Sequence, residues 1–125
     1  MLWEIIQTVR QQLAEALDVR TVIIGDDDIP ASLIPAVKIN PMVVASDSSA
    51  EIPIVIELTL SIELIFDGKV SSDKLSSQTT KAVETLNTDI YPVGCRLVNS
   101  PSSRIYANSN YSTIRLTIRW IERES

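Results

Sequence analysis

Residues 52–66 read IPIVIELTLSIELIF, and every even-numbered position in this stretch is apolar. The odd positions include Glu57, Thr59, Ser61 and Glu63. Alternation with a period of two indicates a β-strand that buries one face and leaves the other wetter. At roughly 3.3 Å per residue the strand would span about 50 Å, which is long for a strand in a small domain. We therefore expect a subunit that builds a sheet or a ring with its neighbours.

A second alternating stretch covers residues 111–123 near the end of the sequence. Its apolar positions are Ile114, Leu116, Ile118 and Trp120, and its polar positions include Arg115, Thr117 and Arg119. Opposite charges that face each other across a β-ladder stabilise it by roughly 0.2–1 kcal/mol per pair. We predict that the two strands are neighbours, in one chain or across a subunit boundary, with Glu57 and Glu63 facing Arg115 and Arg119. The alternative is that each strand has only a soluble outer face.

The remaining elements complete an α+β pattern. Apolar residues at helical spacing predict amphipathic helices over residues 2–17 and 72–88, the second capped by Ser71 or Ser72. Shorter strands are expected at residues 19–24, 36–39 and 93–98, and the prolines that flank 36–39 favour an edge position for it. We predict a single α+β domain over residues 1–125. It would consist of a mostly antiparallel β-sheet with two α-helices packed on one face.

Composition argues against several classes of function. The chain has a net charge of −5, which disfavours tight binding to a nucleic-acid backbone. It has no histidine and three glycines, so neither histidine-based catalysis nor a dinucleotide fingerprint can be assembled. Glu57 and Glu63 would lie about 20 Å apart along one strand, too far for a carboxylate pair. We expect no enzyme activity, no catalytic residues and no cofactor.

Two local features of the sequence contain residues that could carry chemistry. Cys95 is the only cysteine, and without a histidine to activate it we expect a small buried strand residue. Asp26, Asp27 and Asp28 are consecutive in the sequence, whereas magnesium and calcium sites need carboxylates spaced so that they converge. We therefore expect no metal site. The N-terminus does not read as a signal peptide and no stretch is apolar enough to span a membrane, so a cytoplasmic location is expected.

The order of elements resembles the tail terminator (tail-completion) proteins of long-tailed bacteriophages, a family that includes the lambda tail terminator. The residues that carry the resemblance are Ile34-Pro35-Ala36-Val37-Lys38-Ile39, residues 54–66 and residues 111–118. The resemblance implies a homo-oligomeric ring of six subunits in the virion tail or neck, assembled in the host cytoplasm. Such a ring caps the tail tube, stops its polymerisation and joins the tail to a head-tail connector or stopper protein.

The same resemblance implies that DNA passes through the ring without specific binding. On this view Asp26, Asp27 and Asp28 form an acidic loop that faces the channel and repels DNA. Two other hypotheses stay open from the residues alone. One is another phage neck, minor tail or head-tail joining protein. The other is a small module that binds a peptide along the proline-flanked strand 36–39 by strand addition.

Overall fold

The computed structural model describes residues 1–46 and 54–122. Its elements, in chain order, are α1 (Leu2–Ala16), β1 (Thr21–Ile24), the short 3-10 helix η1 (Ala31–Leu33), β2 (Ala36–Ser46), β3 (Ile54–Ile65), α2 (Ser72–Leu86), β4 (Arg96–Leu97), β5 (Ser102–Ile105) and β6 (Tyr111–Glu122). Residues 52, 53 and 123, which the sequence placed in the two alternating strands, lie outside the described residues. The expected α+β class, with a mostly antiparallel sheet and two helices, is confirmed.

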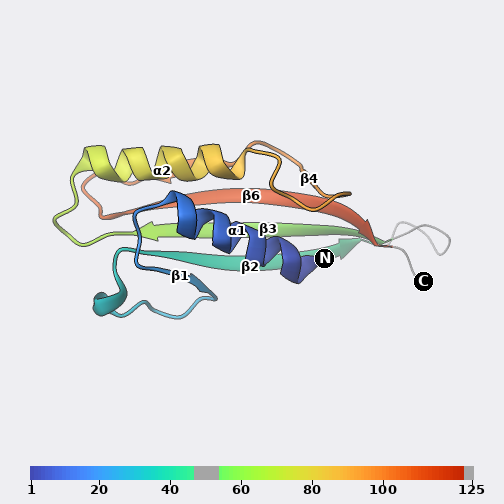
Figure 1. Ribbon diagram of the computed structural model, residues 1–125, viewed down its shortest axis with the longest axis horizontal. Coiled ribbons are helices and arrows are strands. Elements are labelled where there is room, and N and C mark those ends of the chain that lie inside the picture. The colour runs from blue at the N-terminus through green and yellow to red at the C-terminus, as the bar shows by residue number, and fades with distance from the viewer. Residues whose placement is uncertain (47–53, 123–125) are drawn as a thin grey trace.

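The strands form one sheet in the order β1-β2-β3-β6-β4 (Figure 1). A further strand, β5, also pairs with β6. β1 runs parallel to β2, and all the other pairings are antiparallel. The two alternating strands are direct neighbours, because β3 pairs with β6 from Ile54↔Glu122 to Ile65↔Tyr111. The long strand is therefore the centre of the sheet, with β2 on its other side.

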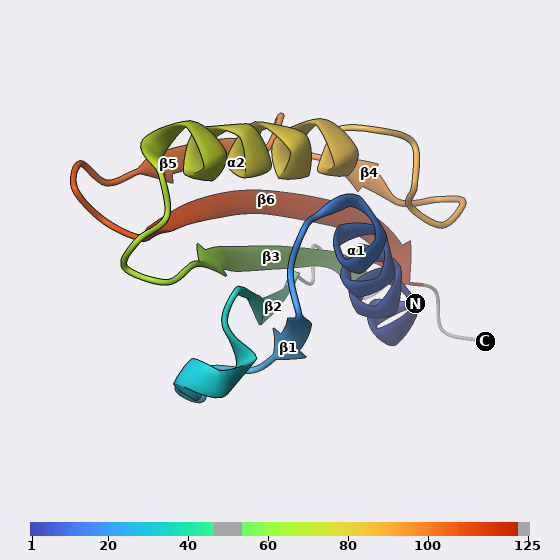
Figure 2. The ribbon, with the colours of Figure 1, turned by 60° about the vertical axis from the view of Figure 1, so that its left-hand side comes forward.

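The core lies between the sheet and its two helices. Leu58, Leu60, Ile62 and Leu64 of β3 are fully buried, and Ile5, Val9 and Leu13 of α1 belong to the same apolar cluster. From α2 the cluster takes Leu75, Ala82 and Leu86. Figure 2 shows α1 and α2 next to each other on one side of the sheet. The two helices therefore cover the even-numbered face of β3, as the alternation predicts.

Polar contacts position α2 within this layer. The Ser71 hydroxyl accepts a hydrogen bond from the Lys74 backbone N–H at 3.1 Å, so Ser71 is the N-cap of the two candidates that the sequence offered, Ser71 and Ser72. Thr79 is buried, and its hydroxyl lies 2.6 Å from the hydroxyl of Ser112 on β6. Lys74 also reaches Asp18 after α1, with Nζ 2.8 Å from Oδ2, and this contact lowers the pKa of the Asp18 carboxyl. The helices are thus tied to the sheet and to each other.

The expected edge position of residues 36–39 is wrong. Val37 and Ile39 lie between two strands, because β1 pairs with residues 36–39 on the side opposite β3. The strand also continues through Pro41 to Ser46. The Ile39 carbonyl accepts from the Gly25 N–H at 2.8 Å, so backbone groups at alternate positions of β2 face the β1 side. The backbone nitrogen of Pro41 also faces the β1 side, at a position beyond the end of β1. Because no strand pairs there among the described residues, the N–H that proline lacks removes no hydrogen bond from the sheet.

The region between α2 and β6 also differs from expectation. Only Arg96 and Leu97 are in a strand where residues 93–98 were predicted. Cys95 precedes that strand and is half-buried, with Sγ 3.3 Å from Sδ of Met1, so its prediction as a buried strand residue is wrong. A further strand, Ser102–Ile105, was not predicted because all four of its side chains are exposed and show no alternation of burial.

We expect Leu60→Ala to lower the free energy of unfolding by about 2–5 kcal/mol, since it leaves a cavity under the centre of β3. Leu60 has 0% exposure. Urea unfolding followed by far-UV circular dichroism measures the change. The matched control is Ser61→Ala, the next residue on the opposite face, which should change the value by about 0.5 kcal/mol or less. Equal losses for the two variants would contradict a one-sided core.

Candidate assembly surface

The face of the sheet away from the helices presents rows of side chains across three strands. The register aligns Met42, Thr59 and Thr117 in one row, and the row on either side contains Glu57 or Ser61 of β3. The Thr59 and Thr117 hydroxyls lie 3.1 Å apart in the middle of the face. This open face is polar at its centre, and most of its β3 side chains are half-buried. Among the described residues, no helix covers this face.

Glu57 and Arg119 form an ion pair directly across the β3–β6 ladder. Nε of Arg119 donates to Oε1 of Glu57 at 2.9 Å, and the terminal nitrogen of the guanidinium contacts the same oxygen. The two side chains are 37% and 36% exposed, so water screens the interaction. Exposed pairs of this kind stabilise a protein by at most about 1 kcal/mol. The pair therefore contributes little to the stability of the fold.

Glu63 and Arg115 are not opposite each other. Glu63 lies opposite Thr113, and Arg115 lies opposite Ser61, so the two charges are diagonal neighbours on adjacent rows. On its other side Glu63 lies opposite Lys38 of β2. The Lys38 ammonium is 3.6 Å from a carboxylate oxygen of Asp26. Of the four charged residues predicted to pair across the two strands, the structure brings Glu57 and Arg119 into direct contact.

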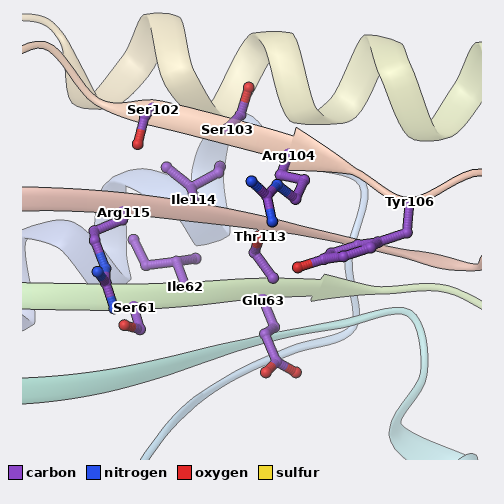
Figure 3. A pocket seen from close by; sticks show the side chains of 10 residues that line it. All are labelled: Ser61, Ile62, Glu63, Ser102, Ser103, Arg104, Tyr106, Thr113, Ile114 and Arg115. Carbon is purple, nitrogen blue, oxygen red and sulfur yellow. The ribbon is translucent and has the colours of Figure 1, made fainter.

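Arginines gather at the β6 side of the open face. Arg96 lies opposite Arg119 across the β4–β6 ladder, and Arg104 lies opposite Thr113 across the β5–β6 ladder. Figure 3 shows Arg104 and Arg115 extending from neighbouring strands around a depression that Glu63 also lines. The open face thus carries five cationic side chains, from Lys38, Arg96, Arg104, Arg115 and Arg119, and two carboxylates, from Glu57 and Glu63.

This basic face stands in contrast to the whole chain, whose net charge is −5. Sequence reasoning missed Arg96 and Arg104, because they sit in short segments without periodicity and only strand pairing brings them beside Arg119 and Arg115.

The three consecutive aspartates lie in the connection that follows β1, at the opposite side of the sheet. Asp26, Asp27 and Asp28 are all exposed, and Asp26 contacts Lys38. Among residues 1–46 and 54–122 there is no group of three or more acidic, cysteine or histidine side chains arranged to hold a metal ion. That this loop faces a channel stays a prediction, since it depends on an assembled form.

Large apolar side chains are exposed along the outer part of β2. Met42, Val43 and Val44 are 57%, 45% and 50% exposed. Ile121, near the end of β6, is 58% exposed. Trp3 is 62% exposed at the start of α1, which places it outside the core. Exposed apolar residues that cluster on one strand are typical of interaction sites.

Burial changes the pKa of two further groups. Burial raises the pKa of the Tyr91 hydroxyl, which donates to the Leu86 carbonyl at 2.6 Å. Burial also raises the pKa of the Cys95 thiol, which lowers its thiolate fraction and its reactivity at neutral pH. Both groups belong to the packing around the end of α2 and the start of α1. Within the described parts of the chain, no helix is long and apolar enough to cross a bilayer.

Comparisons with known proteins bear on the fold. No family model matches the chain, and no curated protein matches it. Among solved structures, a chain described as the virion of a native gene transfer agent particle is similar, with 18% sequence identity and a TM-score of 0.53. The similarity covers 90% of this chain and 90% of that one. The α+β arrangement is therefore shared over nearly the whole length of both chains.

We expect a double-mutant cycle with Glu57→Gln and Arg119→Gln to give a coupling energy of about 0.2–1 kcal/mol. The coupling should shrink in about 1 M salt, where the Debye length is roughly 3 Å. Chemical unfolding of the two single variants and the double variant measures it. Glu63→Gln with Arg115→Gln is the matched control, and its coupling should be smaller, because these two charges are diagonal rather than directly opposite. Equal coupling in both cycles would contradict the register described above.

Proposed function

We propose that this protein is a structural component of a phage-like virion, and specifically a tail terminator. In this role identical copies form a ring that caps the tail tube, ends its polymerisation and joins the tail to the head connector. The proposal assigns no catalytic step and no cofactor to the chain. The observation that carries it is the fold match with a chain of the gene transfer agent virion over 90% of both lengths.

The distribution of surface features supports self-assembly. One side of the sheet ends in exposed arginines on β4, β5 and β6, and the other ends in three exposed aspartates and an apolar strand. Opposite charges on opposite sides of one subunit favour a heterologous contact, in which different surfaces of two copies meet. Heterologous contacts generate closed rings when the rotation between copies closes. A ring is the form that a tube cap requires.

The same observations also support a neighbouring neck or head-tail joining protein, and the partner separates the two. A terminator binds the end of the polymerised tail tube, whereas a joining protein binds the head connector alone. A monomeric peptide-binding module is the other candidate, favoured by the exposed apolar residues of β2. Peptide binding along residues 36–39, as the sequence suggested, is excluded because β1 already pairs with that side of β2. Self-association in the absence of any peptide separates this candidate from the first two.

We expect the purified protein to form particles with a central hole, of mass about six times the 13.8 kDa monomer. Multi-angle light scattering measures the mass, and negative-stain microscopy shows the shape. Added to polymerising tail-tube protein of the same phage, it should shorten the tubes and appear at one end. Tube protein with bovine serum albumin is the control. A protein that stays monomeric at high concentration and leaves tube length unchanged would contradict the proposal.

A further inference from the structure

The outer half of β2 has a free edge. β1 pairs with residues 36–39 only, and within residues 1–46 and 54–122 no other strand continues along that side of β2. Because the Ile39 carbonyl bonds to Gly25 on the β1 side, the backbone groups of Pro41, Val43 and Ala45 also face that side. Val43 and Ala45 therefore present N–H and carbonyl groups to an open edge, which is a template for pairing with another strand.

The opposite side of the sheet has a second free edge, on β5. The Thr117 carbonyl accepts from the Val98 N–H at 2.9 Å, so odd-numbered backbone groups of β6 face β4 and β5. Ser102 and Arg104 lie opposite odd-numbered residues of β6, and they use their backbone groups on that ladder. Ser103 and Ile105 consequently direct theirs outward. All four residues of β5 are exposed, and no described strand lies beyond them.

We propose that β5 of one copy adds to the free edge of β2 in a second copy, with Val43 opposite Ile105 and Ala45 opposite Ser103. This inference rests on the ring assembly proposed above and names the contact that builds it. Along the sheet, β2, β3, β6 and β5 alternate in direction, so β2 and β5 are antiparallel within one copy. When a sheet of like-oriented copies continues edge to edge, the two strands again meet antiparallel.

The side chains on the two edges match in this register. Val43 and Ile105 both lie on the helix side of the sheet, since their ladder partners are the buried residues Leu58 and Ser112. They are 45% and 44% exposed, so each can cover the other. The next pair places Met42 opposite Tyr106, which are 57% and 37% exposed. Apolar and aromatic cross-strand pairs stabilise a ladder by roughly 0.2–1 kcal/mol each.

Charge favours this heterologous contact over a symmetric one. Two copies could also meet through β2 alone, but that arrangement would place two acidic loops, each with Asp26, Asp27 and Asp28, at the same joint. Addition of β5 instead brings Arg104 to the side of β2 where those aspartates lie. Charges attract or repel appreciably within about 8–10 Å at ordinary salt. Since each copy then uses two different edges, the contact can repeat from copy to copy.

The register also implies a stagger. Within one copy, Val43 is level with Ile118 of β6, whereas Ile105 is level with Ser112, six residues away. Successive copies would therefore step by roughly 20 Å along the strands, at about 3.3 Å per residue. A stagger of this kind is the geometric condition for closing a sheet on itself with tilted strands.

Cysteine cross-linking of the assembled protein tests the contact. Val43→Cys and Ile105→Cys are made in a Cys95→Ala background, and both replaced side chains are about half exposed. Directly opposed residues in a hydrogen-bonded antiparallel pair have Cα atoms about 5.5 Å apart, within the range of a disulfide. The double variant, oxidised under ring-forming conditions, should give a non-reducing gel ladder that ends at the ring size. Mixing the two single variants should give a covalent dimer.

The controls separate the alternatives. Val43→Cys with Ser77→Cys, an exposed position on α2, should give no covalent species. Cross-linking of Val43→Cys with itself would overturn the proposal in favour of a symmetric β2 contact. Rings seen by microscopy in which Val43→Cys with Ile105→Cys gives no cross-link would overturn this contact and leave the ring proposal standing. A double variant and a parent protein that are both monomeric by light scattering would overturn both proposals.

Discussion

The structure depends on the pairing of β3 with long strands on both of its sides. β2 and β6 each follow β3 for most of its length, and the even-numbered side chains of β3 form the floor of the core. Because side chains alternate with a period of two, a slip of one residue would turn Leu58, Leu60 and Ile62 out to solvent. The cost of exposing them holds the register in place. That register in turn decides which charges meet on the open face.

Both helices lie on one face of the sheet, so the other face stays open to solvent. The charge of this open face is set by which strands pair with β6. Arg96 and Arg104 come from two separate short strands, yet they lie on the same face as Arg115 and Arg119 because each pairs with β6. A chain with a net charge of −5 thereby acquires a basic surface at one side of the sheet. The acidic residues are concentrated elsewhere, including the exposed loop after β1. This separation of basic and acidic side chains arises from the fold and cannot be read from the overall composition.

The features that alternation or helical spacing controls were predictable from the sequence. The two alternating strands, both helices and a serine cap at Ser71 or Ser72 follow from local pattern. The adjacency of the two strands was predicted from the complementary charges on their polar faces. Three features were not predictable, each for a physical reason. Pro41 suggested the end of a strand, but β2 continues through it, because its ring nitrogen faces the side where β1 has already ended. β5 has no buried face and therefore no periodicity. The diagonal offset of Glu63 and Arg115 depends on the register between β3 and β6, and no short turn sets it, because α2, β4 and β5 separate these strands in the sequence.

A monomeric sheet normally protects its edges with lysine, proline, bulges or short strands. On the uncovered part of β2 the only such residue is Pro41. The three residues that follow, Met42, Val43 and Val44, are apolar and exposed. β1 is four residues long and covers only the first part of an eleven-residue strand. The uncovered part keeps its outward backbone donors and acceptors in regular β geometry. An apolar, regular and unprotected edge opposite a second free edge is the arrangement that strand addition between identical copies requires.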